Sequence, residues 1–462
     1  MLFNSLEFII FFPVVTLLYF LLPHKFRWIH LLLASCIFYA AFIPQYLLIL
    51  FFLIIIDYTA GILIENSPDK KKWLIVSLVA NISLLAVFKY YNFFTGNINN
   101  LTGSHLILLH WALPIGLSFH TFQSMSYTIE VYHNRQKATR HLGYYALYVM
   151  FYPQLVAGPI ERPQNLFPQF FTEQKFSSQK LYEGLRLMTW GFFKKLVIAD
   201  RIGQYADAVF NNTGHAPGLP VWLAVFFFSI QIYADFSGYS DIAIGAARCM
   251  GIDLHINFNR PYQASNIREF WKRWHISLST WFRDYVYIPL GGNRKGSIRT
   301  KMNLVLTFIL SAFWHGAGWT FIAWGILHST YTLIYDSIKN YVTKTPRIIA
   351  SVITFVSVCF AWIFFRASSI NNAMQVISHG LNLQTFSSGI AIPGVKIEFG
   401  NFTLAFSFCM MAYMFIAERY TSPKLFDLNT RKVADIGIFS ATILLIIFFG
   451  VFQKSSFIYF QF

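Results

Sequence analysis

Long apolar runs recur along the whole chain, and they constrain its fold more than any other feature of the sequence. A run of about 18 residues or more is long enough to cross a hydrocarbon core of about 30 Å. Backbone groups within lipid have no water to bind, so such runs must satisfy their hydrogen bonds internally, as helices. Only 12% of the 462 residues are charged, whereas about a quarter of a soluble domain is charged. The sequence therefore predicts an all-α, polytopic membrane protein.

We expect about 11–12 spans, some of them re-entrant or interfacial, within a single domain that covers residues 1–462. The predicted segments are 6–22, 28–43, 46–64, 73–94, 106–128, 142–157, 181–199, 219–247, 303–335, 348–366, 402–418 and 435–452. The run 303–335 is longer than the roughly 20 residues of one upright helix, so it should be kinked, strongly tilted or folded into a tight hairpin. The first run lacks a basic segment before it and a small-residue cleavage site, so we interpret it as a retained span.

The net charge of +16 is distributed unevenly between the predicted connections. Connections after the first and third runs carry Lys or Arg and those after the second and fourth carry none, as the positive-inside rule requires. The densest basic segment, 248–301, has ten Lys or Arg residues and three carboxylates, so we expect it on the cytoplasmic side. Topology and contact with lipid headgroups would explain this charge, and so would a landing site for an anionic cytosolic substrate. Nucleic acid is not expected, because membrane-embedded aromatic residues interleave with the charges.

Two histidines lie in segments where an ionisable ring is unusual. His315 falls in SAFWHGAGW, near the middle of an uncharged run, and ionisable residues at such depth are usually functional. His275 falls in NIREFWKRWHISLSTWF, which has the pattern of an amphipathic interfacial helix. Asn266 and Glu269 have the spacing of a capping box at the start of that helix. A packing role and a functional role are both open for His275. The four cysteines have no paired spacing, so we expect neither a disulfide framework nor a metal site.

Carboxylates also occur within an apolar stretch, in IYADFSGYSDIAIG (232–245). Buried carboxylates in a membrane are expensive and mark either a functional site or a tightly paired one. Neighbouring tyrosine and serine side chains would serve as hydrogen-bond partners, so a core that pins helices together is the simpler interpretation. We assign four residues to this supporting polar core: Asp235, Tyr239, Asp241 and Asn257.

Five motifs follow one another along the chain: QLVAGPIERP (154–163), YADFSGYSDIAIG (233–245), INFNRPY (256–262), FWKRWHISLSTWFRDYVYIPLGG (270–292) and SAFWHGAGW (311–319). Together, and in this order, they resemble the motifs of the membrane-bound O-acyltransferase (MBOAT) family, and most of all those of its bacterial branch of alginate O-acetylation membrane proteins. The family's near-invariant histidine falls on His315 and its second motif histidine falls on His275, so the resemblance implies that both are catalytic.

The resemblance also implies a reaction. Family members transfer an acyl group from a thioester to a hydroxyl, and in this branch the group crosses the membrane through a central tunnel in the protein. We therefore expect a membrane O-acetyltransferase of the bacterial inner membrane that uses cytosolic acetyl-CoA as a substrate and needs no cofactor or metal. The expected acceptor is a hydroxyl of an extracytoplasmic polysaccharide, reached directly or through a periplasmic SGNH-type acetyltransferase or esterase partner. Membrane lipids are the other expected contact.

Acyl transfer from a thioester to a hydroxyl requires a base and a binding site for the anionic donor. A neutral imidazole can take the proton of a hydroxyl as it attacks a thioester, and burial keeps an imidazole neutral. Basic side chains would hold the phosphates of CoA at the cytosolic mouth. The indole N–H of Trp314, or a backbone amide near Gly316, would stabilise the oxyanion. The residues that we predict to bind the acyl donor are Lys272, Arg273, Arg283, Trp274 and Trp314. A polysaccharide or lipid transporter and a structural scaffold of an export complex remain as alternatives, and thioester consumption would distinguish them from an enzyme.

Overall fold

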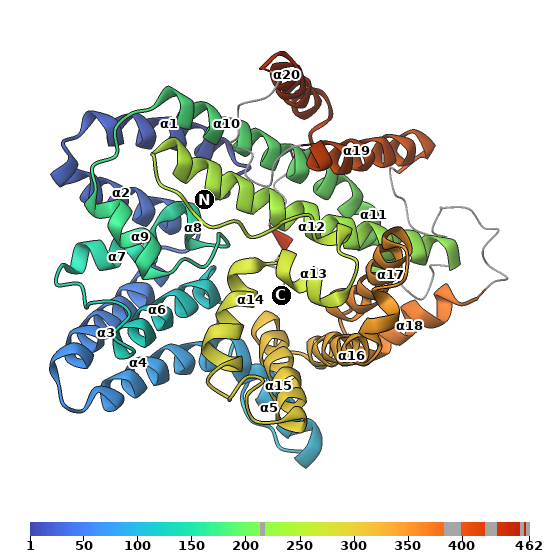
Figure 1. Cartoon of the computed structure of the whole chain (residues 1–462), viewed down its shortest axis with the longest axis horizontal. Coiled ribbons are helices and arrows are strands. Elements are labelled where there is room, and N and C mark those ends of the chain that lie inside the picture. Colours follow the sequence, from blue (N-terminus) through green and yellow to red (C-terminus); the bar gives the residue numbers. More distant parts are fainter. Residues whose placement is uncertain (213–217, 383–398, 421–431, 453–456, 459–462) are drawn as a thin grey trace. The chain divides into compact units, whose positions relative to one another are not determined.

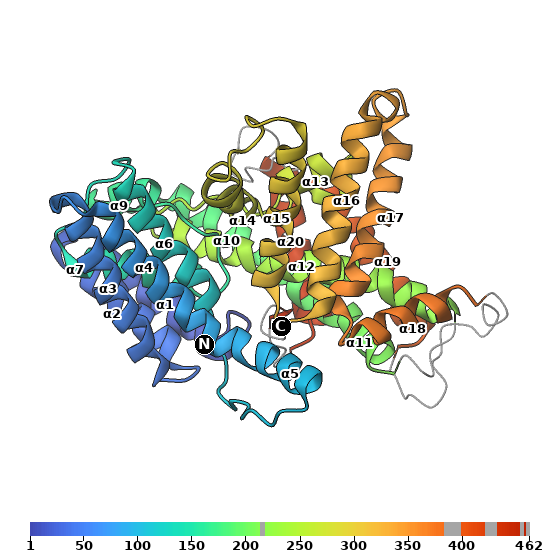
Figure 2. The ribbon, with the colours of Figure 1, turned by 90° about the horizontal axis from the view of Figure 1, so that it is seen from below.

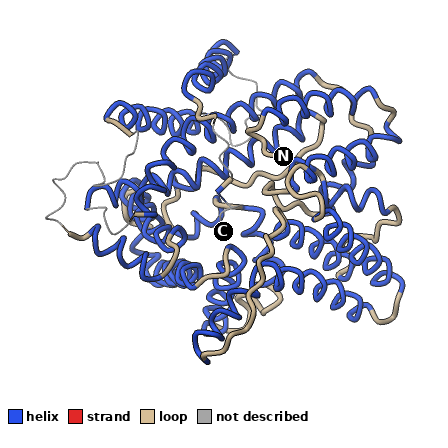
Figure 3. Tube along the Cα trace, turned by 180° about the vertical axis from the view of Figure 1, so that it is seen from behind, coloured by secondary structure: helices blue, strands red, loops and turns tan. Residues whose placement is uncertain are grey.

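The computed structural model describes the chain in five stretches, and the regular elements within them are all helices (Figures 1 and 3). These stretches are residues 1–212, 218–382, 399–420, 432–452 and 457–458. The chain divides into two compact units, each with its own packed interior. Helices α10 and α12 cross the boundary and contribute residues to both units. The single domain that the sequence predicts for residues 1–462 stays a prediction.

The first unit comprises Met1–Met188 and Tyr239–His255. Its helices are α1 (Leu6–Leu21), α2 (His24–Ala40), α3 (Tyr46–Asn66), α4 (Lys70–Leu85), η1 (Ala86–Tyr90), α5 (Tyr91–Thr102), α6 (Leu117–Tyr132), α7 (Leu142–Met150), α8 (Tyr152–Leu155), α9 (Pro163–Phe171) and most of α10 (Ser178–Phe192). Helices α3, α4 and α6 pack side by side (Figure 2). Within them, buried Asp57 accepts hydrogen bonds from Ser77 Oγ at 2.6 Å and Asn81 Nδ2 at 2.9 Å. A carboxylate in an apolar bundle is thus held by neighbouring polar groups.

The second unit comprises Thr189–Gly238 and Ile256–Phe462. Its helices are η2 (Phe193–Ala199), α11 (Asp200–Asn211), most of α12 (Gly218–Cys249), η4 (Pro261–Gln263), α13 (Ile267–Arg273), α14 (Ile276–Phe282), η5 (Arg283–Tyr287), α15 (Ser297–His315), α16 (Trp319–Val342), α17 (Arg347–Arg366), α18 (Ile370–Gly380), α19 (Asn401–Tyr420) and α20 (Lys432–Phe449). Helices α15, α16 and α17 run alongside one another (Figure 2). Both predicted catalytic histidines belong to this unit.

Several helices are long and apolar enough to cross a bilayer, as the sequence predicts for a polytopic all-α membrane protein. Within the described stretches there are five of them: Tyr46–Asn66, Lys70–Thr102, Gly218–Cys249, Arg347–Arg366 and Asn401–Arg419. Leu6–Leu21 and Ile436–Phe449 are shorter apolar helices. The predicted total of 11–12 also includes helices that are shorter or more polar than these. The central tunnel stays a prediction.

The run 303–335 forms the tight hairpin that was one of its three predicted forms. Helix α15 ends at His315, a short extended turn follows, and α16 begins at Trp319. Gly316 is required in this turn, because a Cβ atom there would lie 2.0 Å from the ring of Phe321. The hairpin therefore places His315 at a helix end, beside a close contact between the turn and α16.

Two predicted spans begin or break elsewhere. The span predicted at 106–128 becomes helical only at Leu117, because Pro114 and the left-handed Gly116 (φ 78°) precede it. The span predicted at 142–157 breaks at Phe151, two residues before Pro153, into α7 and α8. Proline restricts the backbone conformation of the residue before it and provides no N–H donor. The boundaries that we predicted from apolar character alone were therefore wrong.

The predicted interfacial helix is also two helices rather than one. Its start follows the capping box in part: Asn266 Oδ1 accepts the Glu269 N–H at 2.9 Å, but the Glu269 carboxylate accepts from the Ser265 N–H at 2.7 Å. The helix then breaks at His275, which has left-handed backbone angles (φ 42°, ψ 57°). Because few residues other than glycine adopt this conformation, the break places His275 at a specific turn between α13 and α14.

Candidate active site

The two predicted catalytic histidines lie together in the interior of the second unit. Their ring centroids are 6.4 Å apart, and the two residues are 0% (His275) and 4% (His315) exposed. His275 comes from the turn before α14, and His315 comes from the last residue of α15. Two segments whose histidines are 40 residues apart in the sequence therefore pack together in the structure.

The turn that carries His275 is held by a polar residue of the INFNRPY motif. Asn257 accepts hydrogen bonds through Oδ1 from Ser277 Oγ (2.6 Å) and from the Ser277 N–H (3.3 Å). Its backbone carbonyl also accepts the Ile276 N–H at 2.9 Å. Asn257 therefore satisfies the amides that are exposed by the break in the helix. It fixes the backbone on which the His275 ring is mounted.

Aromatic rings surround both imidazoles. Phe236 lies edge-on to His275 with centroids 4.6 Å apart. The ring of His315 contacts those of Trp314 (4.9 Å), Trp324 (5.4 Å) and Phe365 (5.4 Å). Burial lowers the pKa of the His275 imidazole, which lies outside the candidate spans, to about 3. An apolar site of this kind keeps an imidazole neutral, and only the neutral ring can accept a proton.

A cavity of about 500 Å³ lies in the same unit, between α13, α14, η5, α15 and α16. Three basic side chains line it: Arg268, Lys272 and Arg283. Its other walls include Trp271, Phe308 and Ser311, and Ser311 lies one turn before His315 on α15. Neither histidine ring belongs to this lining. The lining of the cavity thus combines basic and aromatic side chains, as the binding of a phosphate-bearing substrate with a less polar arm would require.

The five residues that we predicted to bind the donor have different surroundings in the structure. Lys272 and Arg283 line the cavity. Arg273 does not, because its guanidinium is directed to Glu269, with Nη2 and Oε1 2.5 Å apart. Trp274 is 1% exposed and packs in the core, and Trp314 lies within ring contact of both histidines. A direct role in donor binding stays a prediction for all five residues.

The four residues of the predicted polar core are divided between the two units. Asp235 and Asn257 belong to the unit of the histidines, and Tyr239 and Asp241 belong to the other unit, so a common polar core stays a prediction. Asp235 accepts from Lys195 Nζ at 2.7 Å and from the Ile458 N–H at 2.7 Å. The sequence analysis did not single out Lys195, although a lysine within the apolar segment 181–199 was a visible sign of a buried ion pair.

A third histidine near this site was also missed. His328 on α16 is 0% exposed, and its ring lies 4.8 Å from that of Trp324 and 5.0 Å from that of Trp271. It occurs 13 residues after His315 in the same uncharged run. The criterion that singled out His315, an ionisable ring in an apolar run, applies equally to His328.

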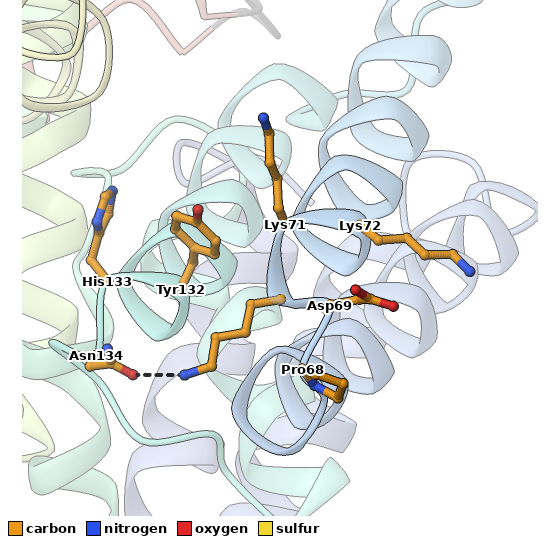
Figure 4. Close-up of a pocket in the computed structure, with 8 residues that line it drawn as sticks. Pro68, Asp69, Lys71, Lys72, Tyr132, His133 and Asn134 are labelled. Atoms are coloured by element: carbon orange, nitrogen blue, oxygen red, sulfur yellow. Dashed lines mark hydrogen bonds between the residues drawn. The ribbon is translucent and has the colours of Figure 1, made fainter.

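The first unit has two charged features of its own. In the QLVAGPIERP motif, fully buried Glu161 accepts from the ring of His255, with Oε2 and Nδ1 2.7 Å apart, and this hydrogen bond raises the pKa of His255. A second cavity, of about 520 Å³, lies beside the start of α4, and Lys70, Lys71 and Lys72 are among the residues that line it. Lys70 Nζ is 3.5 Å from Asn134 Oδ1, whereas the Lys71 side chain points away from Asn134 (Figure 4). The charge of this cavity belongs to one of the connections predicted to face the cytoplasm.

Comparison with known proteins identifies the class of enzyme to which this helical fold and buried histidine pair belong. The chain matches the model of the membrane-bound O-acyltransferase family over residues 61–373. It is 39% identical to a peptidoglycan O-acetyltransferase of Helicobacter pylori, over 83% of this chain and 80% of that protein. It is 36% identical to a probable alginate O-acetylase, AlgI, of Pseudomonas aeruginosa, over 92% and 83%. A teichoic acid D-alanyltransferase of Bacillus subtilis is 30% identical over 54% and 68%.

The protein is therefore a multi-pass membrane acyltransferase. It belongs to the MBOAT family, as its five motifs indicate. Membership of an enzyme family sets aside the transporter and scaffold alternatives.

Proposed function

We propose that this protein transfers an acetyl group from cytosolic acetyl-CoA to a hydroxyl of an extracytoplasmic polysaccharide, directly or through a periplasmic SGNH-type partner. The proposed location is the bacterial inner membrane. The observation that carries the proposal is the pair of buried imidazoles, 6.4 Å apart, in the same unit as a cavity lined by three basic side chains. The names of the relatives, which are a peptidoglycan O-acetyltransferase and probable alginate O-acetylases, support acetyl as the group and a cell-envelope polysaccharide as the acceptor.

His315 is the general base in this proposal. As the acceptor hydroxyl attacks the thioester carbonyl carbon, its proton passes to the imidazole and a tetrahedral oxyanion forms. Collapse of this intermediate breaks the carbon–sulfur bond, and the proton passes to the sulfur of CoA. The buried aromatic surroundings favour the neutral imidazole that the first step needs. A positioned base of this kind contributes about 10²–10⁴ to the rate.

Lys272, Arg283 and Arg268 bind the phosphates of CoA in this proposal. All three line the cavity, and the sequence places them in the segment predicted to face the cytoplasm. Arg268 pairs with Asp336 and Arg283 pairs with Asp284, so both guanidinium groups are partly neutralised. Lys272 therefore carries more of the expected attraction for the donor than either arginine.

The test is reconstitution of the purified protein in liposomes with acetyl-CoA and a soluble polysaccharide acceptor, with and without a periplasmic partner encoded beside it. We expect release of free CoA together with ester-linked acetate on the polymer. If CoA release in these liposomes does not exceed that in empty liposomes in either condition, acetyl-CoA is not the donor.

A further inference from the structure

Three aromatic side chains between the cavity and His315 hold buried polar atoms that have no hydrogen-bond partner in the described part of the chain. The indole nitrogens of Trp271 and Trp324 and both ring nitrogens of His328 are buried, and none has a hydrogen-bond partner among the described residues. Trp324 and His328 are each 0% exposed. Buried polar groups in proteins are almost always hydrogen-bonded, so several unsatisfied ones at one place call for a ligand or water.

The three rings are in mutual contact. The centroids of Trp271 and Trp324 are 5.7 Å apart, those of Trp271 and His328 are 5.0 Å apart, and those of Trp324 and His328 are 4.8 Å apart. We call these three residues the indole–imidazole cluster. Trp271 lines the cavity, and Trp324 contacts the ring of His315 at 5.4 Å. The cluster therefore connects the cavity with the proposed base.

The chemistry of the cluster restricts what it can bind. An indole N–H is a donor only, so Trp271 and Trp324 can be satisfied only by acceptor atoms. A neutral imidazole provides one further donor and one acceptor. A hydrocarbon chain has no acceptor and would leave these groups unsatisfied. Carbonyl oxygens fit them, and a short acyl thioester on a pantetheine arm carries one thioester carbonyl and two amide carbonyls.

We propose that the indole–imidazole cluster is the hydrogen-bonding part of the acyl-donor site, and that it recognises the thioester carbonyl and the amides of the pantetheine arm. This assignment rests on the proposed function and deepens it. Trp324, which contacts His315, donates to the acyl carbonyl oxygen. Trp271 and His328 bind the amide groups of the arm nearer the cavity. When the carbonyl oxygen becomes the oxyanion, the hydrogen bond from Trp324 strengthens and stabilises the transition state.

Trp362 provides a matched control for Trp324. It is 1% exposed and stacks against Trp324 with centroids 5.8 Å apart. Its indole nitrogen already donates to Tyr262 Oη at 3.2 Å. A Trp→Phe change removes the same volume and the same N–H group at either position, but only Trp324 is assigned to the acyl carbonyl.

The experiment compares equilibrium binding of acetyl-CoA and S-ethyl-CoA to the full-length protein in nanodiscs, in the absence of acceptor. S-ethyl-CoA is a thioether that lacks the carbonyl oxygen. We expect the wild-type protein to bind acetyl-CoA about tenfold more tightly, the effect of one hydrogen bond to a buried donor. The ratio should fall to about one in Trp324→Phe and stay near ten in Trp362→Phe.

Each other outcome overturns the assignment. Equal binding of the two compounds by the wild-type protein would show that no group recognises the carbonyl, and this result needs no variant to fold. A ratio near ten in Trp324→Phe, or near one in Trp362→Phe, would show that the Trp324 N–H is not the group responsible. If the wild-type protein bound neither compound, the proposed CoA donor would be wrong and the assignment would be lost with it.

Discussion

The turn beside His315 allows a sharp test of how finely the base is positioned. In Gly316→Ala, the new Cβ atom would lie 2.0 Å from the ring of Phe321, whereas ordinary contacts begin at 3.4 Å. The turn or the ring must therefore move by about 1.4 Å, and we expect overpacking to cost about 1–3 kcal/mol of stability. Displacement of a catalytic group by about 1 Å costs roughly 100-fold in rate. Gly316→Ala should therefore fold and lose about 100-fold in acetyl transfer.

Gly318→Ala is the control for this change. Its new Cβ atom would meet its nearest neighbours at 3.5 Å, an ordinary contact, and neither glycine has a positive φ. We expect Gly318→Ala to keep the rate within about threefold of the wild-type value. The assay is the initial rate of CoA release by protein that elutes as a single species in detergent. Equal rates for the two variants would refute the positional argument, and replacing Phe321 by Leu in the Gly316→Ala background should recover part of the activity.

Three further predictions concern the cavity, the His275 turn and the first unit. Lys272→Ala and Arg283→Ala should each raise the KM for acetyl-CoA more than they lower kcat, because phosphate binding is shared by ground and transition states. The control is acetyl-pantetheine, which lacks the nucleotide, and its KM should not change. Asn257→Ala should cost about 1–3 kcal/mol in thermal unfolding, because it removes two hydrogen bonds that buried Ser277 donates to Asn257 Oδ1. Asn257→Asp should recover most of this loss. The pKa of His255 is higher in the folded state than its ordinary value of 6.5, so its hydrogen bond with Glu161 should stabilise the fold fully below pH 6.5. This contribution should be lost as the pH rises through the pKa of the folded state. Glu161→Gln should flatten this dependence of the melting temperature on pH.

The features that the sequence predicted well are those determined by local pattern. Apolar runs must be helical in lipid, so the helices of Gly218–Cys249 and Arg347–Arg366 lie close to their predicted positions. An ionisable ring in an uncharged run must have a partner or a task, so His315 could be identified without a structure. The same reasoning extends to His328 and would have found it.

The features that the sequence did not predict depend on tertiary contacts. Arg273 and Lys272 are adjacent in the chain, yet one pairs with Glu269 and the other lines the cavity. Their directions depend on how α13 packs, which no spacing reveals. Lys195 and Asp235 are 40 residues apart and meet only because η2 and α12 pack together. A carboxylate in an apolar stretch indicates that a partner exists, but it does not identify that partner.

The most direct test of the central claim is the rate of radiolabelled acetyl transfer by His315→Ala in liposomes, measured beside the wild-type protein and the exposed-residue control His110→Ala. Every step that we propose depends on a neutral imidazole at position 315, and neither Asn nor Gln can replace it as a base. We predict that His315→Ala inserts and folds but transfers less than about one hundredth of the wild-type acetate, within the 10²–10⁴ expected of a general base, and that His110→Ala is unaffected. A His315→Ala protein that keeps more than roughly a tenth of the wild-type rate would contradict the general-base role.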